Sequence, residues 1–246
     1  MARISAYHRP SSVEDALALL HRSTVRTVVL GGGTTVVPSR FEVPTEVVDL
    51  QSCGLAGIVI DRSMARIGAT TALDTIVDHA AMPFVLRDAA RREQPSTLRT
   101  LATIGGVVVG RHRESELLAA LLVLDAVVTF VNGSGAHTRS LDDALADPSV
   151  LHNAIVTAIE VQIDGGASAA RTGRTPFDSP IVAVVGRRRP DGSTVVAATG
   201  VATTPVRIDH PGAVEPPGDF RGSSAYRRHL VVELTARVTA ALEVLA

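Results

Sequence analysis

The alternation of apolar and polar positions along the chain predicts an opening βαβ-like unit. Apolar residues at 16–20 recur at helical spacing after Ser-Ser-Val-Glu at 11–14, which has the form of a capping box. Uninterrupted apolar runs at 27–30 and 47–50 have the length of short buried strands. We expect both strands in one small sheet, and we expect this unit to end near Cys53.

From Gly57 onward, short apolar runs separated by turn residues predict a second unit. The dipeptide Asn132-Gly133 is the strongest hairpin signal in the chain, because both residues accept the positive φ of a tight hairpin turn. The predicted elements are strands at 58–60 and 65–68, helices at 71–80, 83–94 and 114–124, and hairpin strands at 126–131 and 136–139.

The last third of the chain predicts a sheet followed by a helix. Alternating segments at 155–163, 181–185 and 194–202 are expected to form a three-stranded antiparallel meander. A Pro/Gly-rich segment at 209–218 then leads to a final helix at 224–245. The fold class is therefore α+β with mixed sheets, divided into domains at 1–53, 54–150 and 151–246.

Composition narrows the range of functions. Of the 246 residues 46% are hydrophobic but only 3% are aromatic, with no Trp, so the core is aliphatic and a base-stacking platform is not expected. The net charge of −1 provides no field for nucleic acid or an acidic membrane. Cys53 is the only cysteine, which excludes an internal disulfide and an iron–sulfur cluster held by this chain alone.

Two further expectations follow from local sequence. There is no charged-then-apolar leader and no apolar run of about 18–20 residues, so neither an export signal nor a membrane span is predicted, and a cytoplasmic location is expected. The run Arg187-Arg188-Arg189 precedes the turn Pro190-Asp191-Gly192 and is interpreted as a solvated hairpin tip. His112 is expected on an exposed loop, and Cys53 is expected to fill an apolar site.

Two glycine loops carry the clearest chemical signal. They are Gly31-Gly32-Gly33-Thr34-Thr35 and Thr103-Ile104-Gly105-Gly106, and each follows an apolar run that reads as a strand. Consecutive glycines let backbone N–H groups converge on one point, and threonine hydroxyls add donors, which suits a phosphate. For an isolated Gly-Gly, an ordinary tight turn is the commoner interpretation. Neither loop is a Walker A sequence or has the Rossmann spacing.

The two loops, in this order, resemble those of the FAD-binding medium subunit of molybdenum hydroxylases of the carbon monoxide dehydrogenase and xanthine dehydrogenase type. The resemblance covers nearly the whole chain. It implies the two-subdomain FAD-binding fold of the vanillyl-alcohol oxidase (PCMH) type, with a C-terminal α+β domain. The matching segments are Leu-Gly-Gly-Gly-Thr at 30–34, Ile-Gly-Ala-Thr-Thr at 67–71, Ala-Thr-Ile-Gly-Gly at 102–106, Gly-Val-Ala-Thr-Thr-Pro-Val-Arg at 200–207 and Ser-Ser-Ala-Tyr-Arg-Arg at 223–228.

The resemblance also implies a cofactor and a set of site residues. FAD would be held at its pyrophosphate by the two loops, with Arg171 offsetting charge near the flavin. Glu116 stands where the family has an aspartate that contacts the cofactor, although a first-turn helix acid is an equally good interpretation. The implied site residues are Gly31, Gly32, Gly33, Thr34, Thr35, Thr103, Ile104, Gly105, Gly106, Glu116 and Arg171.

Partner chains are implied in the same way. An iron–sulfur small subunit would supply electrons, a molybdopterin large subunit would oxidise the substrate, and NAD, oxygen or a quinone would accept the electrons. Two positions depart from the family pattern: Val107 replaces an asparagine and Arg113 replaces a proline. These departures favour an alternative, in which the chain has lost FAD and serves as a structural or assembly subunit.

Overall fold

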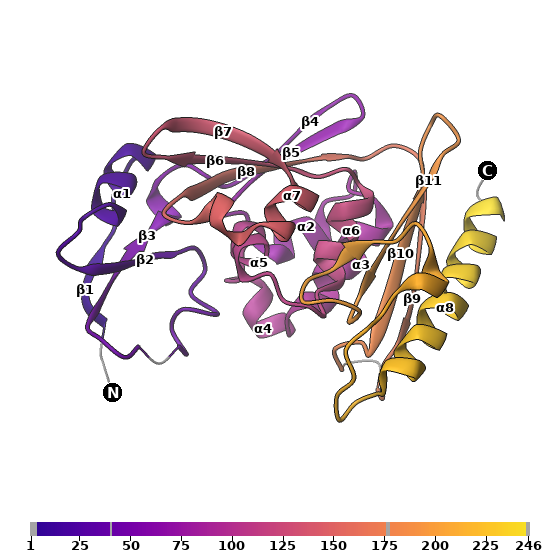
Figure 1. Cartoon of the computed structure of the whole chain (residues 1–246). Helices are drawn as coiled ribbons and strands as arrows, with labels where there is room; N and C mark the ends of the chain where they lie inside the picture. The colour runs from indigo at the N-terminus through magenta and orange to yellow at the C-terminus, as the bar shows by residue number, and fades with distance from the viewer. Residues whose placement is uncertain (1–3, 40, 176–177, 245–246) are drawn as a thin grey trace.

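The computed structural model describes residues 4–39, 41–175 and 178–244, which form three units in a row (Figure 1). Each unit is built on its own sheet, and the strand orders are β1-β3-β2, β4-β5-β8-β6-β7 and β12-β11-β10-β9. The α+β class with mixed sheets is confirmed, because the first sheet is parallel whereas the other two are antiparallel.

The N-terminal unit is the predicted βαβ-like opening. Both predicted strands form, and β3 lies between β1 and β2 and runs parallel to each. The helix cap lies one residue later than the capping-box pattern indicates, because the hydroxyl of Ser12 accepts the N–H of Asp15. The elements are β1 (Ile4–His8), α1 (Val13–Leu20), β2 (Arg26–Leu30), β3 (Thr45–Asp49) and the 3₁₀ turn Leu50–Ser52.

The middle unit packs helices against one face of a five-stranded sheet. The predicted hairpin and both predicted strands form, and the helices beneath the sheet enclose an aliphatic core (Figure 1). The elements are β4 (Ile58–Asp61), β5 (Met64–Gly68), α2 (Leu73–Asp78), α3 (Phe84–Glu93), α4 (Ser96–Arg99), α5 (Ile104–Gly110), α6 (Glu116–Val123), β6 (Val127–Asn132), β7 (Gly135–Ser140), α7 (Leu141–Ala146), the 3₁₀ turn Pro148–Leu151 and β8 (Ile155–Gln162).

The second glycine loop does not follow a strand, and that prediction is wrong. Thr103 is the N-cap of α5, and its hydroxyl accepts the N–H of Gly106, so Gly105 and Gly106 lie in the first turn of a helix. Ile104 and Val108, four residues apart, are both completely buried in the core. Burial of this face favours a helix although glycine and valine have low helix propensity.

The C-terminal unit differs from the expected three-stranded meander. Its sheet has four strands, and the segment predicted at 155–163 is β8, which pairs with β5 and β6 in the middle sheet. The small and polar residues of β9 gave no strand signal, and β9 forms by pairing along β10. The elements are β9 (Gly166–Thr172), β10 (Val182–Arg188), β11 (Thr194–Thr199), β12 (Val206–Arg207), the 3₁₀ turn Pro211–Ala213 and α8 (Ser224–Val244).

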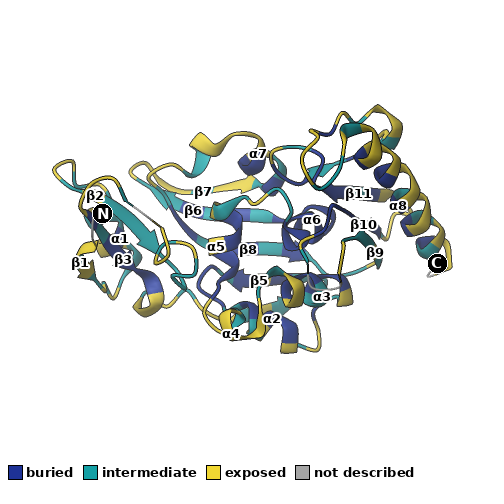
Figure 2. Ribbon diagram, turned by 90° about the horizontal axis from the view of Figure 1, so that it is seen from below, coloured by how far each residue is buried: buried dark blue, intermediate teal, exposed yellow. Residues whose placement is uncertain are grey.

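The final helix covers one face of this sheet and exposes the other side of its own surface (Figure 2). Its predicted end at Leu245 lies outside the described residues. The division into three domains stays a prediction. Because β8 pairs within the middle sheet, the boundary between the second and third domains would lie after Gln162 rather than after residue 150. No helix in the described part of the chain is both long and apolar enough to cross a lipid bilayer.

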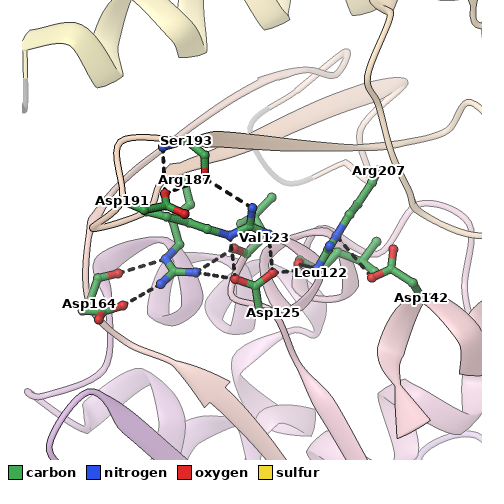
Figure 3. A network of polar contacts seen from close by, with 10 residues as sticks. Leu122, Val123, Asp125, Asp142, Asp164, Arg187, Asp191, Ser193 and Arg207 are labelled. Carbon is green, nitrogen blue, oxygen red and sulfur yellow. Dashed lines mark hydrogen bonds and ion pairs between the residues drawn. The ribbon is translucent and has the colours of Figure 1, made fainter.

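The arginine run is not a solvated hairpin tip, because Arg187 is only 2% exposed. Its guanidinium lies 2.9 Å from Asp125 and 2.5 Å from Asp164 (Figure 3). Arg189 and Arg207 reach the same Asp125 carboxylate at 2.6 and 2.9 Å. Burial opposes ionisation of Asp125, but the three guanidinium groups together hold its pKa below the usual value. The network therefore joins the C-terminal sheet to the end of α6.

We predict that Asp125→Asn lowers the free energy of unfolding by about 3 kcal/mol, because Arg187 would lose one of its two carboxylate partners while remaining buried. Asparagine also tolerates the left-handed backbone at this position, where φ is +52°, so the change tests charge rather than conformation. Urea unfolding at pH 7 measures the difference. Asp191→Asn is the control, since among the described residues that exposed turn residue bonds only to its own hairpin. Equal losses of stability in both variants would contradict the prediction.

Candidate functional site

The two glycine loops, which come from different units, lie in contact. An added Cβ on Gly31 would lie 2.6 Å from Oγ1 of Thr103, and one on Gly32 would lie 1.5 Å from the carbonyl oxygen of Leu101. At Gly32 no side chain fits, because its backbone lies against the backbone of Leu101, and at Gly31 a side chain would meet the Thr103 hydroxyl. The structure thus brings together the two loops that the sequence singled out, although they begin at residues 31 and 103.

The first loop has unused hydrogen-bond donors. Within the described residues, the backbone N–H groups of Gly32, Gly33 and Thr34 donate to no acceptor. Gly33 has φ of +75°, a left-handed conformation that glycine adopts without strain. Successive N–H groups around such a residue form a concave anion-binding surface. This loop therefore has the chemistry to hold a phosphate group.

The second loop uses its donors within the protein. The N–H of Ile104 donates to the carbonyl of Thr71 at 3.1 Å, that of Gly105 to Ala69 at 2.9 Å, and that of Gly106 to the Thr103 hydroxyl at 3.2 Å. The contribution of this loop is therefore its shape: it packs against the first loop and presents the positive N-terminal end of α5.

Glu116 and Arg171 meet at a second place, on the wall of a cavity of about 990 Å³. Arg171 Nε lies 2.9 Å from Glu116 Oε1, and Arg171 also donates to the carbonyl of Asp178. Burial raises the pKa of Glu116, whereas the charges of Arg171 and Arg92 oppose that rise. The cavity lies between α3, α4, the segment 112–116, the end of β9 and the segment 178–180.

The cavity and the glycine loops are joined by one short segment. Pro95, Ser96 and Arg99 line the cavity, and Leu101, two residues after Arg99, touches Gly32. The loop residues themselves are not among the described residues that line the cavity. The predicted site residues therefore fall into two neighbouring groups rather than one.

Sequence reasoning missed Glu93, the last residue of α3, which also lines the cavity. Its Oε2 accepts the Ser115 hydroxyl at 2.8 Å and the N–H of Leu117 at 3.4 Å. Burial raises the pKa of Glu93 to about 7, and the nearby Glu116 charge adds to this, although the two hydrogen bonds act in the opposite direction. The only sequence signal was an acid at the end of the helical pattern before Pro95.

The remaining candidates are placed as follows. His112 is exposed between α5 and α6, as predicted, and borders the cavity. Cys53 is partly buried with its sulfur 3.4 Å from the carbonyl of Ser12, and burial raises the pKa of the thiol, which agrees with its predicted role of filling an apolar site.

Val107, one of the two departures from the family pattern, lies in the core at 8% exposure. Arg113 pairs with Asp219 at 3.2 Å. The described residues contain no group of three His, Cys, Asp or Glu side chains placed to hold a metal ion.

Comparison with known proteins gives a family match. Residues 2–161 match the family model described as FAD binding domain in molybdopterin dehydrogenase. Over 95% of this chain, and 94% of the relative, the sequence is 31% identical to the uncharacterized protein YgfM of Escherichia coli (strain K12). It is 26% identical to the carbon monoxide dehydrogenase medium chain of Afipia carboxidovorans, over 85% of this chain and 78% of the relative.

The fold is shared with a solved structure. Carbon monoxide dehydrogenase from Hydrogenophaga pseudoflava superposes with a TM-score of 0.89, 22% identity and coverage of 99% of both chains. At this identity the likeness concerns the fold, and it confirms the expected FAD-binding fold with an added C-terminal α+β unit.

We predict that Gly32→Ala destabilises the protein by about 2 kcal/mol or more, because the new methyl group would overlap the Leu101 carbonyl and force the two loops apart. Thermal unfolding of the protein without ligand measures this. Gly212→Ala is the matched control, since nothing lies within 4 Å of an added Cβ there. If both variants melt at the wild-type temperature, the two loops are not in contact.

A second prediction concerns pH. The pKa of Glu93 is about 7 in the folded protein and 4.5 as its ordinary value, so the folded state binds more protons between these values. The contribution of Glu93 to the free energy of unfolding is therefore largest below pH 4.5 and is lost as pH rises from 4.5 through 7, by at most about 3 kcal/mol. Glu93→Gln, which stays neutral, should lose less stability than the wild type between pH 5 and pH 8. If urea unfolding shows that the wild type and Glu93→Gln lose the same free energy of unfolding between pH 5 and pH 8, the raised pKa of Glu93 is contradicted.

Proposed function

The chain belongs to the family of FAD binding domains in molybdopterin dehydrogenases, and from this premise we propose that it is the flavin subunit of a multi-subunit molybdenum hydroxylase. In this role it receives electrons from iron–sulfur clusters of a partner subunit and passes them to an acceptor such as NAD, oxygen or a quinone. FAD, when bound, supplies the redox chemistry, and the protein supplies binding, orientation and electrostatics.

The observation that carries the proposal is the contact between the two glycine loops. The free N–H groups of Gly32, Gly33 and Thr34 would hold the pyrophosphate, with Gly31 and Thr35 completing that loop. The second loop, Thr103-Ile104-Gly105-Gly106, contacts the first loop and would bring the N-terminal end of α5 near the group. The residues present therefore fit the cofactor.

The neighbouring cavity provides room for the rest of an elongated ligand. It lies next to the loops through the segment 95–101, and its volume of about 990 Å³ matches a large ligand pocket. On its wall Arg171 would offset negative charge, and Glu116 would fix the position of Arg171 through their 2.9 Å ion pair. The two groups of predicted residues would thus contact two parts of one molecule, the loops its pyrophosphate and the cavity wall a part beyond it.

Partner subunits are proposed from the names of relatives. The relatives include carbon monoxide dehydrogenase medium chains and the nicotinate dehydrogenase FAD-subunit of Eubacterium barkeri, which is 28% identical over 56% of this chain and 49% of the relative. We therefore propose an iron–sulfur small subunit and a molybdopterin large subunit as partners. The substrate would be oxidised on the large subunit.

A second candidate is a family member that has lost FAD and acts as a structural or assembly subunit. The occupied N–H groups of Gly105 and Gly106, and the apolar Val107 where the family has an amide, favour it. This candidate requires the same partners but no flavin. The two candidates differ in one measurable property, the binding of FAD.

We predict that the purified chain binds FAD, giving flavin absorbance bands and a higher melting temperature, because a ligand that binds only the folded state stabilises it. At 100-fold excess over the dissociation constant the expected stabilisation is about 2.7 kcal/mol. Reconstitution with millimolar FAD, followed by desalting, absorbance and thermal unfolding, measures both.

Gly33→Ala tests whether FAD binds at the first glycine loop, which only the flavin-subunit candidate requires. Gly33 has φ of +75°, which strains any residue with a Cβ, so alanine here should disturb the proposed pyrophosphate loop. Gly54→Ala is the control: it has a similar φ of +70° but lies outside the loop and has nothing within 4 Å. Both variants carry comparable backbone strain, and only the first should bind FAD weakly. A colourless wild type with an unchanged melting temperature that still copurifies with both partners would support the structural candidate instead.

A further inference from the structure

Glu93 is a carboxyl group on the cavity wall for which the proposed function has no role. It ends α3, and its side chain is half-buried between α3 and the first turn of α6. Its two recorded hydrogen bonds come from neutral donors, the Ser115 hydroxyl and the Leu117 N–H. Among the described residues no arginine or histidine forms an ion pair with it. The negative charge of an ionised Glu93 would therefore be poorly compensated.

The surrounding elements carry charges that are already paired. On α6, Glu116 is bound to Arg171 of β9, and on α3, Arg92 is bound to Asp88. The other charged or titratable groups around α3 and the cavity are Arg87 and Arg91 on α3, Asp74 on α2 with its partner Arg99 on α4, His112 and Glu114 before α6, and Asp178 after β9. With Arg171 committed to Glu116, Glu93 can remain protonated in a cavity that also opens to water.

A carboxylic acid that is neutral near pH 7 and faces a cavity has the properties of a proton donor. Burial is the main reason that its pKa reaches about 7, which is near the operating pH expected of a general acid or base. When Glu93 ionises, the Ser115 hydroxyl and the Leu117 N–H stay in place to stabilise the carboxylate.

We propose that Glu93 is the proton-exchanging residue of this cavity and serves a flavin ring held there, which rests on the proposed function. Two-electron reduction of a flavin takes up at least one proton, whereas iron–sulfur clusters deliver only electrons. Glu93 releases one proton from its carboxyl group as two electrons arrive, becomes a carboxylate, and recovers a proton from water. Electrons come from the reduced clusters of the partner, and the net proton comes from solvent.

The first measurement uses the protein without FAD. Infrared spectra recorded across pH 5 to 9 should show a protonated carboxyl band in the wild type that disappears as pH rises through about 7. The band should be missing in Glu93→Gln. A wild type and a variant with the same carboxyl band at pH 6 overturn the proposal.

The second measurement is the midpoint potential of bound FAD at pH 6 and pH 8.5. An ionised Glu93 places a negative charge beside the cavity and disfavours the arrival of electrons. Glu93→Gln should therefore have the wild-type potential at pH 6 and a higher potential than the wild type at pH 8.5. Glu114→Gln is the matched control, because Glu114 is also on the cavity wall but pairs with Arg221 at 2.8 Å. The difference in midpoint potential between this variant and the wild type (its offset) should be the same at both pH values.

A second variant covers the case in which Glu93→Gln does not fold. Ser115→Ala removes a donor to the carboxylate, so the infrared band of Glu93 should persist to higher pH than in the wild type. If FAD binds but the offset of Glu93→Gln is equal at both pH values, the role of Glu93 is overturned while the proposed function stands. If the protein takes up no FAD at any pH, the proposed function fails and this role fails with it.

Discussion

Helix α6 is the constraint on which the arrangement of the middle and C-terminal units depends. All eight of its residues are buried, and ion pairs tie both of its ends to the C-terminal sheet. At its start Glu116 pairs with Arg171, and just beyond its end Asp125 pairs with Arg187. A buried charge without its partner is strongly destabilising, so these contacts specify one docking geometry. The cavity between the two units takes its shape from that geometry.

The glycine loops impose a comparable constraint between the N-terminal and middle units. Gly32 lies against the Leu101 backbone so closely that no other residue fits. This contact orients the first loop while leaving its N–H groups unused, and it places the loop beside the segment that leads into the cavity. An extended ligand with a phosphate-rich centre matches this arrangement better than a compact one, since the polar donors and the cavity occupy adjacent positions.

Much of the fold was predictable because local patterns and tertiary burial agree. The hairpin predicted at Asn132-Gly133 formed, but its turn lies one residue later, at Gly133-Ser134, because Asn132 pairs with Gly135. The strand that leads into Gly31 formed as expected. The errors fall where packing overrode local pattern. Glycine and valine at 105–109 form a helix because its face is buried, and β9 is a strand only because β10 supplies its hydrogen bonds. Arg187 looked like a surface residue because its carboxylate partners are 62 and 23 positions away.

The sequence by itself determined the two glycine loops, the order of most elements and the family resemblance, because these depend on residue types at short spacing. Only the tertiary structure decided which groups meet. It showed that the N–H groups of the second loop are already used, that Glu116 and Arg171 form a separate group on a cavity wall, and that Glu93 faces the same cavity. Burial and long-range pairing set the charge states of these groups, and neither can be read from neighbouring residues along the chain.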